Sequence, residues 1–148
     1  MKKQNSEFPI SPQEYKEELE VIHLQEIKLD SCSAKIRRER LGETNRPLKV
    51  EIKSRARYEI LEESVVILTD HFSLVGTLTT KRDYVIKIEC EFSVVIEKEK
   101  GFLKKEFMET YLKLNLEILL WPYFREFIHS MTNRMGLPPI TLPFLKTP

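Results

Sequence analysis

Alternating apolar and polar residues fill the middle of the chain, a pattern typical of strands with one buried face. In the first such stretch Ile22 and Leu24 alternate, the pattern slips near residues 25–26, and Ile27 and Leu29 resume it. A slip of one residue within a regular alternation indicates a β-bulge. We therefore expect a first strand that contains a bulge.

Three further strands are predicted between residues 48 and 98. Residues 48–61 and 65–78 alternate in the same way and are separated by a polar turn. The next strand is the most regular, and its apolar row consists of Ile86, Ile88, Cys90, Phe92, Val94 and Ile96. Polar residues occupy the positions between them, so one face of this strand should be buried and the other wet.

Helical patterns flank the strands. Residues 11–14, Ser-Pro-Gln-Glu, combine an N-cap serine with a proline at the first helical position, so a short helix should run to about residue 19. A long helix should begin after the charged turn at residues 97–101 and expose little of its circumference, because apolar residues recur on several sides of it. Pro122 lacks an N–H and should kink this helix, and Gly136 should end it.

The order short helix, four strands, long helix predicts an α+β fold: a four-stranded antiparallel, meander-like sheet with a long kinked C-terminal helix packed on one face. We expect one domain over residues 1–148, with an N-terminal extension over residues 1–20 and a long irregular connection over residues 31–47. Four strands in one layer cannot cover both apolar sides of the helix. A second copy of the chain is the simplest cover, so a homo-oligomer is expected.

The composition and the absence of several motifs exclude some classes of function. The 24 basic and 23 acidic residues nearly cancel, which removes the usual electrostatic argument for binding nucleic acid. No signal peptide and no apolar run long enough to span a membrane is visible, so we expect a cytoplasmic protein that does not insert into membranes. Cys32 and Cys90 lie far apart in the sequence, and no metal or catalytic motif is present. We expect neither a disulfide nor a metal, a cofactor or an enzymatic activity.

The sequence Pro-Tyr-Phe-Arg-Glu-Phe-Ile-His-Ser-Met at residues 122–131, with Pro-Pro-Ile-Thr-Leu-Pro at residues 138–143, resembles the SecB family of protein-export chaperones. The order of elements agrees over roughly residues 21–143. The resemblance implies a SecB-like fold in which edge strands pair into eight-stranded sheets, and two sheets sandwich the long helices in a dimer of dimers. It implies an ATP-independent chaperone that keeps unfolded or precursor polypeptides competent for translocation. The family also includes members dedicated to the antitoxin of a toxin–antitoxin system, and the sequence leaves both roles open.

The resemblance also implies roles for individual residues. Acidic side chains on the outer sheet face contact the SecA ATPase in the family, and Glu26, Asp30 and Glu89 occupy suitable positions. Residues 31–47 correspond to the crossover loop beside the client groove, although they lack its aromatic residue and are basic instead. The second helix that usually follows the proline-rich tail is absent before Pro148. The candidate client-binding residues are Ile36, Leu41, Phe127, Met131 and Met135.

The candidate oligomer contacts lie along the long helix. They are Tyr111, Leu114, Ile118, Trp121, Tyr123, Arg125 and Glu126. Aromatic residues at helical spacing more often pack in a core than bind a ligand, acidic residues on a wet sheet face are common, and the three arginines at residues 37–40 are typical of a solvated loop. A plain oligomeric scaffold that binds one fixed partner is the alternative to a chaperone. It differs in an observable way, because only a chaperone suppresses the aggregation of unrelated unfolded proteins.

Overall fold

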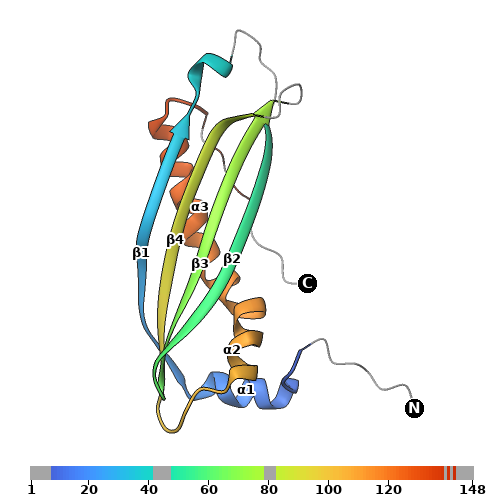
Figure 1. Ribbon diagram of the computed structural model, residues 1–148, viewed down its shortest axis with the longest axis vertical. Helices are drawn as coiled ribbons and strands as arrows, with labels where there is room; N and C mark the ends of the chain where they lie inside the picture. Colours follow the sequence, from blue (N-terminus) through green and yellow to red (C-terminus); the bar gives the residue numbers. More distant parts are fainter. Residues whose placement is uncertain (1–7, 42–47, 79–82, 139, 141, 143–148) are drawn as a thin grey trace, which may run out of the picture.

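The computed structural model describes residues 8–41, 48–78, 83–138, 140 and 142. A tall twisted sheet forms one layer, and the C-terminal helical segment lies along one of its faces (Figure 1). In chain order the elements are α1 (Pro12–Glu20), β1 (Ile22–Ile36), the 3-10 turn η1 (Arg38–Arg40), β2 (Leu48–Glu62), β3 (Val65–Leu78), β4 (Tyr84–Lys98), α2 (Lys105–Tyr111), the π-helical η2 (Leu112–Leu116) and α3 (Glu117–Arg134).

The sheet is antiparallel, with the strand order β1-β4-β3-β2. Four antiparallel strands and one long helical layer confirm the predicted fold class. The meander covers only β2, β3 and β4, however, because β1 pairs with β4 and not with β2. The chain therefore crosses from one edge of the sheet to the other between β1 and β2. The bulge predicted near residues 25–26 is present, and a second irregularity follows between Leu29 and Ser31.

The helix-covered face, called the inner face below, holds the core. Phe72, Leu74, Ile88 and Val94 are fully buried there, and the apolar row predicted for the fourth strand is buried along its whole length. Phe72 stacks on Phe124 of α3 with ring centroids 4.7 Å apart. Rows of this kind, buried against a helix, supply most of the stabilisation of a two-layer fold.

The predicted connection over residues 31–47 is too long in the structure. Strand β1 continues to Ile36, because Cys32 and Ala34 keep the alternation and pair with Cys90 and Ile88 of β4. The turn η1 follows directly, and residues 42–47 lie outside the described residues.

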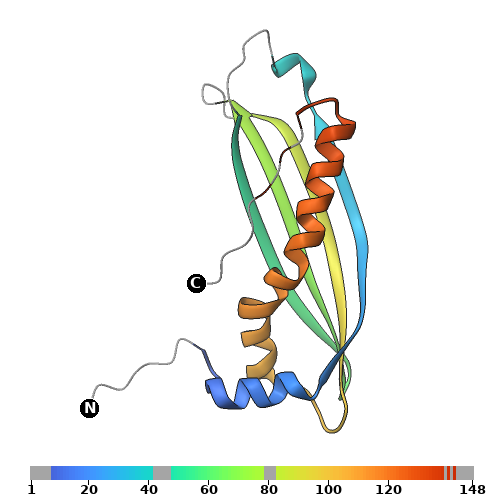
Figure 2. The ribbon, with the colours of Figure 1, turned by 180° about the vertical axis from the view of Figure 1, so that it is seen from behind.

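The bend in the C-terminal helix also differs from the prediction. The axis changes direction between α2 and α3, where η2 has π-helical geometry (Figure 2), whereas Pro122 lies inside the continuous helix α3. Both Pro122 and Ile118 are exposed, so the Ile118 carbonyl that loses its helical donor faces the solvent side. Pi-helical turns are themselves a common cause of helix bends.

Helix α1 closes the lower end of the molecule against the start of the helical layer (Figure 2). Its predicted cap is present, since Ser11 Oγ accepts a hydrogen bond from the Glu14 amide at 3.2 Å. Tyr15 packs on Phe107 with ring centroids 5.3 Å apart, and its hydroxyl donates a hydrogen bond to Asn115 Oδ1. The N-terminal extension is thus attached to the domain through α1.

Candidate functional site

An apolar surface lies on the inner face of the edge strand β1, beside α3. Leu24 is 48% exposed, and Leu29 and Tyr123 are each 46% exposed. Leu29 lies opposite Phe92 of β4, and the Phe92 ring is 6.1 Å from that of Tyr123. Residues paired across strands share a face, so Leu29 and Tyr123 both lie beside Phe92. Leu24, which is opposite Ile96, lies on the same face nearer the start of β1. We call the set Leu24, Leu29 and Tyr123 the β1 surface.

The β1 surface is exposed because of the path of the helical layer. Helix α3 lies over β3 and β4, while η2 lies over β2 and β3. The inner face of β1 therefore carries apolar residues that no described element covers completely. Exposed apolar side chains that share one face of an edge strand are candidates for a binding site.

The candidate client-binding residues lie near the upper end of this surface. Ile36, Leu41, Phe127 and Met131 are half-buried and pack against the edge of the core, whereas Met135 is buried at 8% exposure. The structure thus leaves four of the five partly accessible. Met135 offers little side-chain surface, but its carbonyl accepts a hydrogen bond from Arg38.

The arginines of the β1–β2 connection are not simply solvated, contrary to the interpretation from sequence. Arg38 Nη2 donates a 2.7 Å hydrogen bond to the Met135 carbonyl, at the C-terminal end of α3. Arg40 Nη1 donates to the Tyr84 carbonyl at 3.1 Å, and the Arg37 guanidinium lies 4.1 Å from the Tyr84 ring centroid. A cation at the C-terminal end of a helix is favourable. The Arg38 contact holds η1 beside the end of α3, and the contacts of Arg37 and Arg40 hold the same segment against the start of β4.

The candidate oligomer contacts divide into two groups. Tyr111 and Trp121 are each only 7% exposed and pack inside the chain, the latter against Phe72 and Phe124. They are core residues and offer little surface to a second copy. The others are more accessible: Ile118, Tyr123 and Glu126 are exposed, and Leu114 and Arg125 are half-buried.

The three acidic candidates are not brought together on the outer face. Glu26 lies opposite Val95 and Glu89 lies six positions away along β4, about 20 Å in a strand. Each has a lysine beside it, with Lys28 3.1 Å from Glu26 and Lys87 3.6 Å from Glu89. Asp30 is exposed at the second irregularity of β1, where the strand pairing does not fix its direction.

Sequence reasoning missed two carboxylates. Glu91 contacts Arg57 at 3.0 Å and His71 at 3.4 Å, and the Arg57 guanidinium lowers its pKa. Asp70 lies on the inner face, 1% exposed, and its Oδ1 has no hydrogen-bond partner among the described residues. Burial, and secondly the Glu117 carboxylate, raise the Asp70 pKa to about 6. An aspartate at an inward position of the third strand was the available signal.

The two cysteines, far apart in the sequence, are directly opposite each other on β1 and β4. Both are free thiols. Cys32 is exposed and Cys90 is buried, and burial raises the Cys90 pKa to about 12. Among the described residues no group of three or more His, Cys, Asp or Glu side chains is placed to hold a metal ion.

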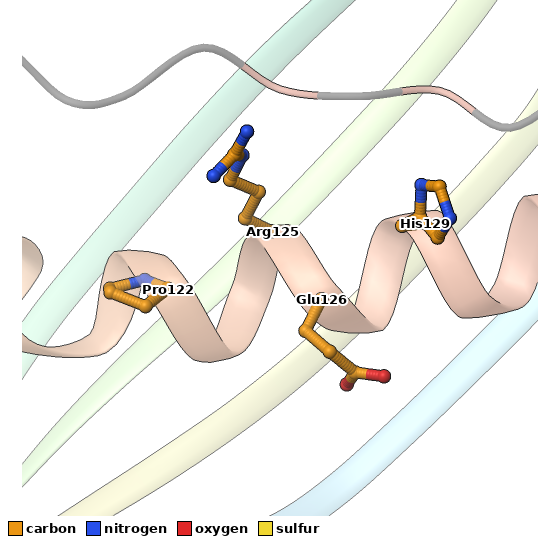
Figure 3. Close-up of a pocket in the computed structure, with 4 residues that line it drawn as sticks. All are labelled: Pro122, Arg125, Glu126 and His129. Atoms are coloured by element: carbon orange, nitrogen blue, oxygen red, sulfur yellow. The ribbon is translucent and has the colours of Figure 1, made fainter.

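A shallow hollow of about 350 Å³ lies on α3, lined by Pro122, Arg125, Glu126 and His129 (Figure 3). Arg125 points from it toward the segment that follows the helix, and its Nε donates a 2.6 Å hydrogen bond to the Leu142 carbonyl. The lining contains no serine, cysteine, threonine or lysine side chain.

Comparison with solved structures places this fold. The chain is similar to the SecB-like chaperone Rv1957 of Mycobacterium tuberculosis, solved in complex with a ChAD peptide from the Rv1956 HigA1 antitoxin: TM-score 0.74, 20% identity, 90% of this chain and 98% of that one. A protein of unknown function from Streptococcus agalactiae matches with TM-score 0.45 and 17% identity over 83% of this chain and 97% of that one. No family model and no curated protein matches the sequence.

The likeness to the first structure shows that the chain has the SecB-like chaperone fold, as the sequence resemblance predicted. In the described part of the chain, no helix has both the length and the hydropathy needed to cross a membrane.

Proposed function

We propose that this chain is a chaperone that holds unfolded polypeptide in an extended form, without nucleotide. The observation that carries the proposal is the β1 surface, where Leu24, Leu29 and Tyr123 are about half exposed beside an edge strand. An unpaired strand edge offers main-chain hydrogen bonds to an added extended chain, and adjacent apolar side chains bind its alternate residues. Such a site has low sequence specificity and can therefore bind many different unfolded chains.

The fold supports the same proposal. It is shared with a SecB-like chaperone that was solved with a peptide from an antitoxin. Between the two roles left open by the sequence, we favour a chaperone dedicated to an antitoxin. The outer face is consistent with this preference, because the lysines beside Glu26 and Glu89 weaken the negative potential that an export ATPase would need.

Export remains the second candidate function. It is favoured by the acidic residues Glu26, Asp30 and Glu89, which are exposed or half-buried on or beside the outer face. A titration of the chain with purified SecA and with peptides from antitoxins of the source organism separates the two roles. Tight binding of an antitoxin peptide with no measurable SecA binding is the expected result, and the reverse would assign the chain to export.

We also propose a homo-oligomer in the cytoplasm, organised as a dimer of dimers. Ile118 is 39% exposed and Tyr123 46% exposed on α3, on the sides of the helix that the sheet leaves open. A second copy that covered this face would bury them. Tyr123 would then be covered by the second copy, so Leu24 and Leu29 are the residues of the β1 surface that must remain accessible for client polypeptide.

The test is light scattering of an unrelated protein that aggregates on dilution from denaturant, with and without this chain and without ATP. Suppression at stoichiometric amounts is the expected result for a holding chaperone. A scaffold that binds one folded partner would leave the aggregation unchanged. Multi-angle scattering of the chain in the same buffer should give four times the chain mass of 17.6 kDa.

A further inference from the structure

The segment that follows α3 turns back along the helix. Gly136 has φ +75°, a left-handed conformation that glycine adopts without strain. The amide of Gly136 donates to the Asn133 carbonyl at 3.0 Å and that of Leu137 to the Thr132 carbonyl at 3.2 Å, which is the Schellman pattern. The chain is thereby directed into the space beside α3, on the side toward β2 (Figure 2).

Two side chains of α3 hold the main chain of this segment. The Ile140 amide donates to Thr132 Oγ1 at 3.0 Å, and Arg125 Nε donates to the Leu142 carbonyl at 2.6 Å. Thr132 and Arg125 are seven residues apart, about 10 Å along a helix. The later residue of the segment contacts the earlier residue of the helix, so Ile140 and Leu142 follow α3 in the antiparallel direction.

The described side chains of the segment become more buried from Pro138 toward Leu142. Leu142 is 4% exposed and Ile140 is half-buried against the core, whereas Pro138 is exposed. We call Leu137, Pro138, Ile140 and Leu142 the tail, and the space that it fills beside α3 the tail channel. The channel supplies one side-chain acceptor, Thr132 Oγ1, and one side-chain donor, Arg125 Nε, for main-chain groups of the tail, together with apolar contacts for residues two apart. Any extended apolar polypeptide presents the complementary groups.

We propose that the tail channel is a second client-binding site and that the tail occupies it as a built-in competitor. This inference rests on the proposed function, and it assigns a regulation to it. An apolar client segment in an extended conformation displaces the tail, accepts the hydrogen bond from Arg125 and donates one to Thr132.

The tail is suited to displacement. Pro138, Pro139 and Pro143 have no N–H, so the segment cannot form a continuous ladder of main-chain hydrogen bonds. Client segments without proline can donate more main-chain hydrogen bonds in the same place. The buried Thr132 hydroxyl also keeps a partner after displacement, because it donates to the Ile128 carbonyl at 2.8 Å. Replacement of the tail by a client therefore leaves no unpaired hydroxyl group at Thr132 on the helix.

The substitution Leu142→Asp tests the inference, because a carboxylate is costly at this buried position and should expel the tail without altering the channel. A fluorescent peptide of residues 136–148 is titrated by anisotropy into the full-length wild type, the variant and a Leu142→Met control. If the tail fills its channel nine-tenths of the time, the variant should bind the peptide about tenfold more tightly than the wild type does. Equal affinities for the three proteins would overturn the proposal.

A competition measurement shows whether an unfolded client binds in the tail channel. Reduced, carboxymethylated α-lactalbumin should displace the bound peptide from Leu142→Asp, and a peptide that stays bound would show that the channel holds the tail but no client. If the variant binds the peptide and yet neither protein suppresses aggregation, the proposed function fails while the tail docking stands.

A measurement on the wild type covers the case in which Leu142→Asp does not fold. The amide of Ile140 should be protected from hydrogen exchange in the free protein, through its bond to Thr132. Saturation with the carboxymethylated protein should raise its exchange rate several-fold. Unchanged exchange at Ile140 with client bound would contradict displacement.

Discussion

Asp70 is the residue whose environment conflicts most with its chemistry. It lies on the inner face between Ala56 and Phe92, with one carboxylate oxygen unpartnered among the described residues. A charge at such a position costs stability unless it is paired. Alternation along the third strand predicts an apolar residue here, so the burial could be foreseen. The proximity of the Glu117 carboxylate could not be predicted, because Glu117 belongs to a helix whose position on the sheet is set by packing.

Substitution of Asp70 with Asn should stabilise the protein at neutral pH. The folded-state pKa is about 6 against an ordinary 3.8, so the wild type loses stability as pH rises from about 4 to 6 and remains lower above that range. Each pKa unit corresponds to 1.36 kcal/mol, so the gain at pH 7 should be up to about 3 kcal/mol and should vanish near pH 4. Urea unfolding at the two pH values measures it. The exposed Asp30→Asn is the control, and equal effects of the two variants would contradict this account.

At the scale of elements, the end of α3 is fixed from two sides, by the Gly136 turn and by Arg38 of η1. The turn could be predicted, since glycine followed by prolines ends a helix. The Arg38 contact could not, because it joins residues 97 positions apart. The π-helical bend was likewise invisible in the sequence, whereas the proline that suggested a kink lies on the exposed side of the helix, where it is tolerated.

Gly136→Ala should destabilise the protein by about 1 kcal/mol, because alanine at φ +75° is strained. Gly76→Ala is the matched control. A Cβ at Gly76 would meet the Ile86 and Leu48 side chains at 3.6 Å, an ordinary contact, and its φ is not positive. Thermal unfolding of the two variants measures the difference, and a larger loss for Gly76→Ala would contradict the assigned turn.

Arg38→Ala should loosen the end of α3. The lost hydrogen bond to the Met135 carbonyl is charge-assisted, and at an exposed position about 1 kcal/mol is expected. Amide hydrogen exchange at the last turn of α3 should rise more than exchange at the centre of the helix. Glu39→Ala on the same turn is the control. Equal changes in exchange along the whole of α3 would show that the Arg38 contact does not act locally on the last turn.

At the scale of the whole molecule, one sheet and one helical layer bury a core over β3 and β4 and leave the inner faces of the edge strands partly open. The apolar residues around the long helix predict uncovered apolar surface, and the exposure of Ile118 and Tyr123 agrees with this prediction. Tyr111 and Trp121 do not, because the sequence pattern around a helix cannot tell which apolar side meets the sheet. The exposure of Leu24 and Leu29 follows from strand order, which alternation does not specify.

The two faces of β1 allow the central claim to be tested with variants of equal charge. Leu29→Lys places an ammonium group on the β1 surface, while Ser33→Lys places one on the outer face of the same strand, opposite Glu89. Both positions are exposed, so stability should change by less than about 0.5 kcal/mol. Unfolding curves for both variants establish this before any chaperone assay.

The most direct measurement is the concentration of chain that halves the aggregation of an unrelated unfolded protein, determined for the wild type, Leu29→Lys and Ser33→Lys without nucleotide. A polypeptide-holding β1 surface predicts that Leu29→Lys needs several-fold more chain, since a charge replaces an apolar contact, whereas Ser33→Lys matches the wild type. Suppression that is equal in all three proteins, or lost only in Ser33→Lys, would contradict the assignment of client binding to the inner face of β1.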